Sequence, residues 1–332
     1  MGYPKPVRLM GLLMRLGRGK ISPCSLRKIE RRPEISPFGL SFDTYTHEKK
    51  NGPIWIVAHG MSVNGKNDHR LVHFAQSLAC SGVTCIAPML NGLSSCRWEP
   101  SDLDNLDQLV QIISGRYGRE VGLIGFSFGG SYCLLTAACG KHAEQVRQII
   151  SFGAYYNWED IFAEYKKNSN PDSLTDEEWD QWLYMRLVII KGYRETALSP
   201  EAGREIDSAL ERYCKNEVST AEKKRLYREY IQYIDLNEAL NAAIKPDILN
   251  ALSPAGKLAN LTCPVTLIHD RHDPVVPSLH AERIYSELLK QSHSHRHRHR
   301  LTLTSILNHV SASPLLDIPD FFRFFKAMSD VL

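Results

Sequence analysis

Residues 121–139 read V-G-L-I-G-F-S-F-G-G-S-Y-C-L-L-T-A-A-C, and this stretch decides the fold. The apolar run at 121–125 predicts a buried strand, and the small apolar residues at 129–139 predict a helix. Glycines stand on both sides of Ser127, so the strand and the helix can approach closely without a clash between β-carbons. The stretch therefore predicts a sharp strand-to-helix turn that carries a serine at its tip.

The position of Ser127 is typical of a nucleophile. A strand-to-helix turn of this kind holds the hydroxyl out of the sheet edge, and the N-terminus of the following helix presents backbone N–H groups to developing negative charge. We expect the N–H of Phe128 to serve such an oxyanion. The N–H of Met61 is the second candidate, because it follows His59-Gly60 at the end of the apolar run 54–58. The alternative is a glycine-rich turn without chemistry.

A serine hydroxyl needs a base, and the base needs an acid that orients it. Asp273 lies in H-D-R-H-D-P-V-V-P, residues 269–277, directly after a predicted strand, and His309 directly follows the last predicted strand. Taken singly, each has an ordinary explanation, as a turn aspartate and as a capping or core histidine. Together, in the chain order Ser, Asp, His, they predict a catalytic triad. Asp270 and, more remotely, Asp160 remain alternatives for the acid.

The rest of the chain predicts an α/β fold, because short apolar runs alternate with amphipathic stretches from about residue 40. Strands are expected at 40–47, 54–58, 83–87, 121–125, 146–152, 265–269 and 301–307. Helices are expected at 71–80, 103–113, 129–139, 279–290 and 318–331. Residues 156–255 show helical periodicity without a convincing strand. The predicted organisation is a basic arm at 1–39, a mostly parallel core at 40–155 and 256–332, and a helical lid at 156–255.

These features resemble the α/β-hydrolase-fold serine hydrolases over residues 40–330. The matching motifs are H-G at 59–60, N-G-L-S at 91–94, G-F-S-F-G-G at 125–130, D-P-V-V-P at 273–277 and a late histidine. The resemblance implies a central, mostly parallel sheet flanked by helices, with a helical lid insertion. It also implies the same roles for the candidate residues: Ser127 as nucleophile, His309 as base, Asp273 as acid, and the N–H groups of Met61 and Phe128 as oxyanion donors. Asp270 stands where many members have glycine, which leaves the choice between the two aspartates open.

The expected function is hydrolysis of a small carboxylic ester or thioester through an acyl-enzyme on Ser127. Transfer of the acyl group to an alcohol or amine, by an acyltransferase with the same triad, is an alternative. A binding protein that retains the fold without turnover is another. No cofactor and no metal are expected. His293, His295, His297 and His299 alternate as zinc ligands on a strand would, but an exposed loop is favoured between a predicted helix and a predicted strand.

The charge distribution bears on partners and location. A net charge of +3 is too small to imply a nucleic-acid partner. Residues 1–35, however, carry nine Lys or Arg against two Glu. This segment is expected to pack on the protein body, with weak contact to an acidic membrane surface as the alternative. The eight cysteines form no C-x-x-C pair, which favours a reducing compartment and a cytoplasmic location. A secretory signal is not expected, because arginines interrupt the N-terminal apolar run and no small-residue cleavage site follows it.

Overall fold

The computed structural model describes residues 28–48, 52–167, 176–197, 199–213, 217–232, 245–290, 299–305, 307–308, 311–312 and 326. The predicted base His309 lies outside the described residues, as do the first 27 residues of the basic arm. The histidine-rich run also lies outside them, apart from its last member, and so does the predicted final helix at 318–331, apart from Lys326.

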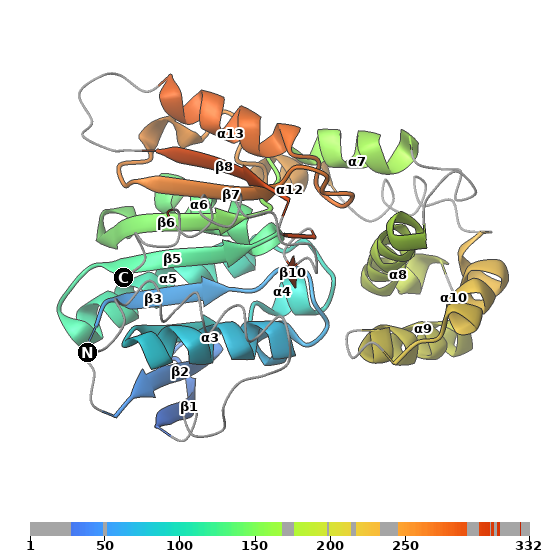
Figure 1. Cartoon of the computed structure of the whole chain (residues 1–332), viewed down its shortest axis with the longest axis horizontal. Helices are drawn as coiled ribbons and strands as arrows, with labels where there is room; N and C mark the ends of the chain where they lie inside the picture. The colour runs from blue at the N-terminus through green and yellow to red at the C-terminus, as the bar shows by residue number, and fades with distance from the viewer. Residues whose placement is uncertain are drawn as a thin grey trace.

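The centre of the described structure is an eight-stranded sheet (Figure 1). Its strands are β1 (Ile29–Ile35), β2 (Ser41–His47), β3 (Ile54–Ala58), β4 (Thr84–Pro88), β5 (Val121–Phe126), β6 (Val146–Phe152), β7 (Val265–Asp270) and β8 (Arg300–Thr304). The spatial order is β1-β2-β4-β3-β5-β6-β7-β8. β2 pairs antiparallel with both of its neighbours, β1 and β4. The strands from β4 to β8 in the spatial order pair in parallel, so the carboxyl ends of β3, β5 and β7 share one edge. The predicted α/β sheet is confirmed.

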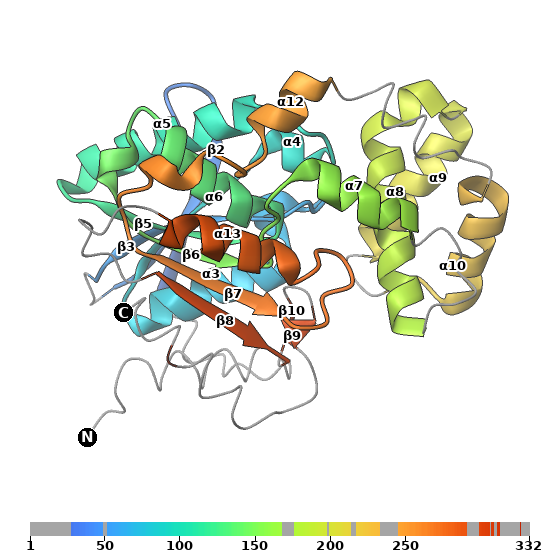
Figure 2. The same cartoon turned by 90° about the horizontal axis from the view of Figure 1, so that it is seen from above.

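Helices cover both faces of this sheet (Figure 2). They are α3 (His69–Ser81), α4 (Asn91–Ser94), α5 (Ser101–Tyr117), α6 (Phe128–Cys139) and α13 (Leu279–Leu289), with short 3₁₀ turns η1 (Gly65–Asn67), η2 (Ala143–Gln145) and η5 (Leu258–Asn260). α3 packs on β2 and β4, and its apolar face joins Trp55 in one buried cluster. α5, α6 and α13 bury their apolar faces in a second cluster on the other side. Burial of apolar side chains in these two layers is the main force that holds the fold together.

The sheet begins earlier and ends differently than the sequence predicted. β1 lies within the predicted arm, yet it forms the edge strand and pairs with β2 along its whole length. Its side chains are mostly exposed and charged, so the sequence does not show the apolar alternation of a strand. Charges and Pro33 are tolerated there because the strand lies at the edge of the sheet. The predicted strand at 301–307 is divided: β8 ends at Thr304, and Leu307 belongs to the short β9 (Leu307–Asn308), which pairs antiparallel with β10 (Ser311–Ala312).

The described elements within residues 156–255, the predicted lid, are helical. They are α7 (Trp158–Lys167), α8 (Asp176–Ala197), α9 (Pro200–Tyr213), α10 (Thr220–Leu226), the π-helix η4 (Tyr227–Ile231) and α12 (Pro246–Ala251). Figures 1 and 2 show α8, α9 and α10 beyond the carboxyl ends of the parallel strands. Their role as a lid stays a prediction.

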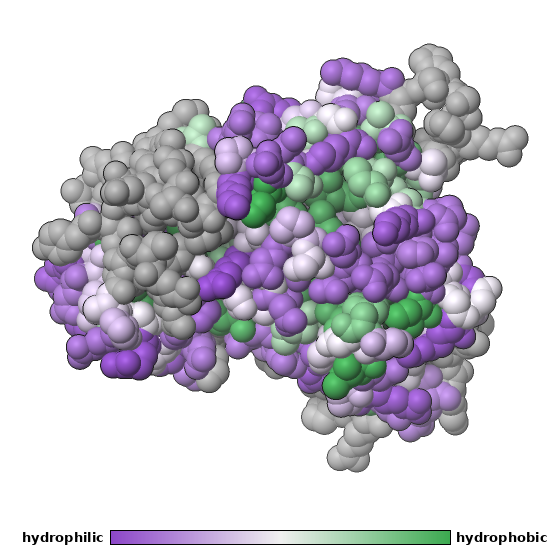
Figure 3. Space-filling view, turned by 180° about the vertical axis from the view of Figure 1, so that it is seen from behind, coloured by the Kyte–Doolittle hydropathy of each residue, from purple (hydrophilic) through white to green (hydrophobic). Residues whose placement is uncertain are grey.

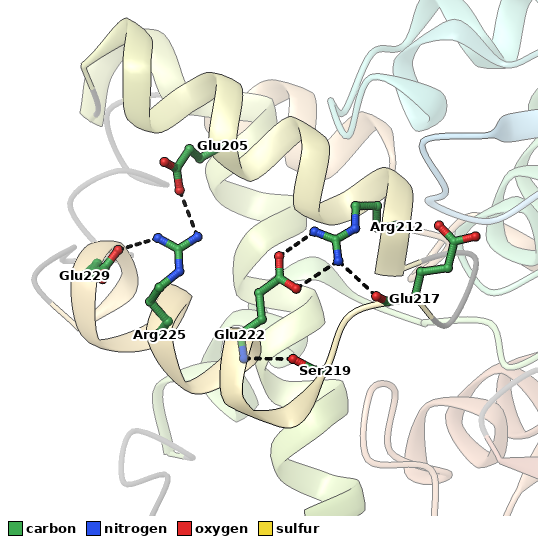
Figure 4. A network of polar contacts seen from close by, with 7 residues as sticks. All are labelled: Glu205, Arg212, Glu217, Ser219, Glu222, Arg225 and Glu229. Carbon is green, nitrogen blue, oxygen red and sulfur yellow. Dashed lines mark hydrogen bonds and ion pairs between the residues drawn. The ribbon is translucent and has the colours of Figure 1, made fainter.

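Two arginines fasten α9 to α10 (Figure 4). Arg212 donates to both carboxylate oxygens of Glu222, at 2.5 and 2.9 Å. Arg225 donates to Glu205, at 3.0 Å, and to Glu229, at 2.6 Å. Exposed ion pairs contribute little singly, but a connected set with bidentate geometry fixes the relative orientation of two short helices.

A close backbone contact seats α8 on the core. The peptide of Gly192 lies against Cys96, such that a Cβ atom built on Gly192 would be 2.1 Å from the Cys96 carbonyl oxygen. Arg97 Nε donates to the Gly192 carbonyl oxygen at 3.2 Å. Buried side chains of α7 and α8 also belong to the apolar cluster that contains Phe128. The helical insertion is therefore packed on the strand-end region. Seen from behind, the surface of the described residues is mostly hydrophilic, with apolar patches between (Figure 3).

Candidate active site

The backbone of Ser127 is strained. Its φ is 51° and its ψ is −121°, at the junction where β5 ends and α6 begins. Such a conformation costs an L-residue on the order of 1–3 kcal/mol and persists only where the surroundings impose it. A hydrogen bond from the Ser127 N–H to the Phe152 carbonyl oxygen, at 2.7 Å, and one from the Gly130 N–H to the Ser127 carbonyl oxygen, at 2.8 Å, hold it. The predicted strand-to-helix turn is present, with Ser127 at its tip.

Glycines make the close packing at this turn possible. A Cβ atom on Gly125 would lie 2.3 Å from the Gly129 carbonyl oxygen, and one on Gly129 would lie 2.3 Å from the His59 carbonyl oxygen. A Cβ atom on Gly60 would lie 2.9 Å from the Phe126 carbonyl oxygen and 3.1 Å from Ser127 Cβ. The loop that begins at Gly60, and continues into Met61, therefore lies directly against the serine turn.

The side chain of His59 holds the loop at Gly60 and Met61 in place. Its Nδ1 lies 2.7 Å from the Gly60 carbonyl oxygen, and its Nε2 accepts a hydrogen bond from the Leu90 N–H at 3.0 Å. These two bonds require Nδ1 to carry the proton of a neutral imidazole. Burial lowers the pKa of His59 to about 4, against smaller opposing effects of the bond to Gly60 and the charge of Asp68. His59 thus joins the candidate oxyanion loop to the segment before α4.

A buried carboxylate holds α4 in turn. Asp102 accepts hydrogen bonds from the Gly92 N–H, at 3.2 Å, and the Leu93 N–H, at 2.9 Å. Burial raises the pKa of Asp102 to about 6, although these N–H groups act in the opposite direction. The rigid support of the strand-end region therefore contains two titratable groups with displaced pKa values.

The loop after β7 positions Asp273. Its side chain is fully buried, and Oδ1 accepts from the Val275 N–H, at 2.9 Å, and from the Val276 N–H, at 2.8 Å. Oδ2 takes no part in these two bonds and lies 3.4 Å from His269 Nε2. Two backbone donors on one oxygen fix the plane of the carboxylate and stabilise its charged form.

The two alternative acids have other environments. Asp270 Oδ1 accepts from the His272 N–H at 3.0 Å, an Asx turn that closes the start of the loop. Asp160 is in α7, and its half-exposed carboxylate forms an ion pair with Arg283. Asp273 combines full burial of its side chain with two backbone donors on one carboxylate oxygen.

The segment next to His309 approaches the same region. β9 contacts β7, and Leu307 is buried in the apolar cluster that also contains Phe152 and Ile268. Figures 1 and 2 show β10 at the carboxyl-end edge of the sheet. The described residues on both sides of position 309 therefore belong to the edge that carries Ser127.

Aromatic rings form the layer beside the serine turn. The Phe128 ring lies 5.2 Å from that of Tyr155 and 5.1 Å from that of Trp158, measured between centroids. Trp158 in turn packs edge to face against Trp98 at 4.7 Å. Trp158 is fully buried, so this aromatic residue of the insertion is part of the core.

Among the described residues, no cluster of His, Cys, Asp and Glu has the composition of a metal site. In the same part of the chain, none of the helices has the length and apolar character needed to cross a membrane.

Sequence reasoning assigned no supporting role to three residues of the candidate site: His59, which it used only as part of the H-G motif, Asp102 and His269. His59 and His269 each directly precede a residue that was noticed, but their roles depend on contacts with Leu90 and Val276 that no local pattern encodes. Asp102 reads as an ordinary acidic residue in the first turn of a helix. The one available signal in the sequence was a polar residue in or beside an apolar run next to a motif, because a buried polar group needs hydrogen-bond partners.

Comparison with known proteins places the chain in a family. The sequence profile of the alpha/beta hydrolase fold matches residues 56–300. No curated protein sequence matches at a significant level.

Solved structures with a similar fold include three hydrolytic enzymes. An esterase of Pyrococcus furiosus is 13% identical, with a TM-score of 0.51 over 94% of this chain and 94% of that one. The Pyrococcus horikoshii acylaminoacyl peptidase is 12% identical, with a TM-score of 0.53 over 92% of this chain and 41% of that one. A meta-cleavage product hydrolase of Pseudomonas fluorescens is 16% identical, with a TM-score of 0.50 over 92% of this chain and 100% of that one. The profile match spans well over half of the sequence, and the chain belongs to the α/β hydrolase fold family.

Proposed function

We propose that this protein is a serine hydrolase that cleaves a carboxylic ester or thioester through an acyl-enzyme. Ser127 is the nucleophile, His309 the general base and Asp273 the acid that orients the base. The N–H groups of Met61 and Phe128 form the oxyanion site.

The reaction follows from these roles. Ser127 Oγ attacks the carbonyl carbon while His309 accepts the hydroxyl proton, and the oxyanion of the tetrahedral intermediate is held by the two N–H groups. The intermediate collapses, and the alcohol or thiol leaves with the proton from His309. Water then attacks the acyl-enzyme with His309 as base, and the carboxylic acid is released from Ser127.

The observation that carries the proposal is the strained backbone of Ser127 between a buried strand and a helix N-terminus. A serine with an ordinary structural role has no need of this conformation, which here occurs directly at the N-terminus of α6. The second supporting observation is the buried Asp273, which follows β7, two strands away from β5 in the sheet. The similar solved structures support the fold alone, and the Pyrococcus furiosus protein, an esterase, agrees with the proposed reaction class.

The test is a substrate screen with a matched variant. The full chain and Ser127→Ala are assayed against p-nitrophenyl esters and acyl-coenzyme A thioesters of increasing acyl length, with release of the free acid as the readout. We expect hydrolysis by the wild type, and a loss of at least about 10³-fold in the variant at unchanged thermal unfolding. Equal hydrolysis by both proteins would contradict the proposal.

A further inference from the structure

His269 is buried next to the candidate acid, and the proposed triad does not use it. It is the fifth residue of β7, only 1% of its side chain is exposed, and it pairs with Leu303 of β8 in the sheet. Its Nε2 lies 2.7 Å from the Val276 carbonyl oxygen and 3.4 Å from Asp273 Oδ2. A carbonyl oxygen accepts only, so Nε2 must carry a proton that points into the loop after β7.

The contacts form a closed ring of three residues. Asp273 Oδ1 accepts from the Val276 N–H, the Val276 carbonyl oxygen accepts from His269, and His269 Nε2 faces Asp273 Oδ2. The His269 side chain thus contacts the peptide that fixes one carboxylate oxygen and also faces the other oxygen. Inside the protein, where water does not screen the N–H dipole, this geometry favours one orientation of the carboxylate.

We propose that His269 is a positioning residue for Asp273, which holds the Val276 peptide with its Nε2–H and thereby sets the direction in which Oδ2 meets the catalytic base. This inference rests on the proposed function. It assigns to His269 no contact with the substrate.

The role has a definite kinetic signature. Loss of the Nε2–H leaves Asp273 in place but frees the Val276 peptide, which supplies one of the two donors that hold its carboxylate. The carboxylate is then held less firmly, and the base is oriented less often in the reactive tautomer. Small errors of position in an active site are costly, and we expect His269→Leu to lower kcat by about 10- to 100-fold with KM nearly unchanged. His269→Gln places an amide N–H near the position of Nε2 and should retain activity within about fivefold of the wild type.

The experiment measures kcat and KM for His269→Leu, His269→Gln, Asp273→Asn and the double variant His269→Leu with Asp273→Asn, on one p-nitrophenyl ester. Because His269 acts through Asp273, the leucine substitution should have almost no further effect in the Asp273→Asn background. The asparagine side chain is too short to reach the Val276 carbonyl oxygen. His269→Asn therefore replaces His269→Leu if the leucine protein fails to fold.

Three results would overturn the inference: an equal loss in His269→Gln and His269→Leu, a change confined to KM, or fully additive losses in the double variant. Its failure is separable from that of the proposed function. If Ser127→Ala and Asp273→Asn abolish hydrolysis while His269→Leu is fully active, the triad stands and only the positioning role is wrong.

Discussion

Gly60 lies so close to Ser127 that a Cβ atom on Gly60 would be 3.1 Å from Ser127 Cβ and 2.9 Å from the Phe126 carbonyl oxygen. The two residues come from the ends of neighbouring parallel strands, β3 and β5. This contact sets the distance between the proposed nucleophile and the loop that carries the Met61 N–H. It is the feature through which the fold creates a site at the sheet edge.

Gly60→Ala should therefore damage catalysis more than binding. The added methyl group must push the Met61 loop away from Ser127, which weakens the oxyanion site, and we expect kcat to fall by about 10²- to 10³-fold with a smaller change in KM. Steady-state kinetics on one ester measure this. The matched control is Gly115→Ala, on a helix where a Cβ atom meets nothing within 4 Å. Retention of full kcat in Gly60→Ala would show that this contact does not shape the site.

The two aspartates after β7 should respond differently to removal of their charge. In Asp273→Asn and Asp270→Asn, the amide oxygen can still accept the local backbone hydrogen bonds, so both proteins should fold. Asp273→Asn, however, can hold the base in the wrong tautomer, and we expect kcat/KM to fall by roughly 10³- to 10⁴-fold. Asp270→Asn should lose less than about tenfold, since its Oδ1 serves the His272 N–H.

The comparison requires matched thermal unfolding of the two variants before kinetics. A larger loss in Asp270→Asn would transfer the role of the acid to Asp270. Negligible loss in both variants would show that the acid does not come from this loop.

The fold was predictable where the pattern of the chain is local. The continuous apolar run of β3 and the helical spacing of α3 reveal their type without tertiary information. β1 was missed because an edge strand needs no apolar alternation. The support of the site could not be predicted, because it depends on pairs distant in sequence, such as His59 with Leu90 and Gly192 with Cys96.

His59 should make stability depend on pH. Its pKa is about 4 in the folded protein and 6.5 when unperturbed. Between pH 6.5 and 4 the unfolded chain therefore binds a proton at His59 that the folded protein does not. This contribution to the unfolding free energy is present above pH 6.5 and falls as the pH decreases, by about 3 kcal/mol in full.

Asp102 changes the unfolding free energy with pH in the opposite direction, so the test compares the wild type with a His59 variant. Its pKa is about 6 in the folded protein against 3.8, so its contribution to stability increases as the pH falls over that range. Urea unfolding of the wild type and His59→Gln from pH 7 to 4 separates the two groups. The stability advantage of the wild type should shrink by a few kcal/mol towards pH 4. Parallel curves for the two proteins would show that His59 does not titrate in this way.

Gly192→Ala tests the seat of α8 on the core. In a helix alanine is normally better than glycine by about 1 kcal/mol. Here the methyl group would lie 2.1 Å from the Cys96 carbonyl oxygen, so the helix must shift and the bond from Arg97 weaken. We expect the free energy of unfolding to decrease by about 1–3 kcal/mol, measured by urea denaturation. An increase in stability would mean that the two segments are not in contact.

The identity of the nucleophile is the central claim, and covalent labelling tests it most directly. The full chain is treated with a fluorophosphonate probe, which reacts with activated serines, and the modified peptide is located by mass spectrometry. We predict one adduct on Ser127 in the wild type and no labelling of Ser127→Ala, with the two proteins matched in thermal unfolding. Equal labelling of Ser127→Ala, or a wild-type adduct on another residue, would contradict the assignment of Ser127 as the nucleophile.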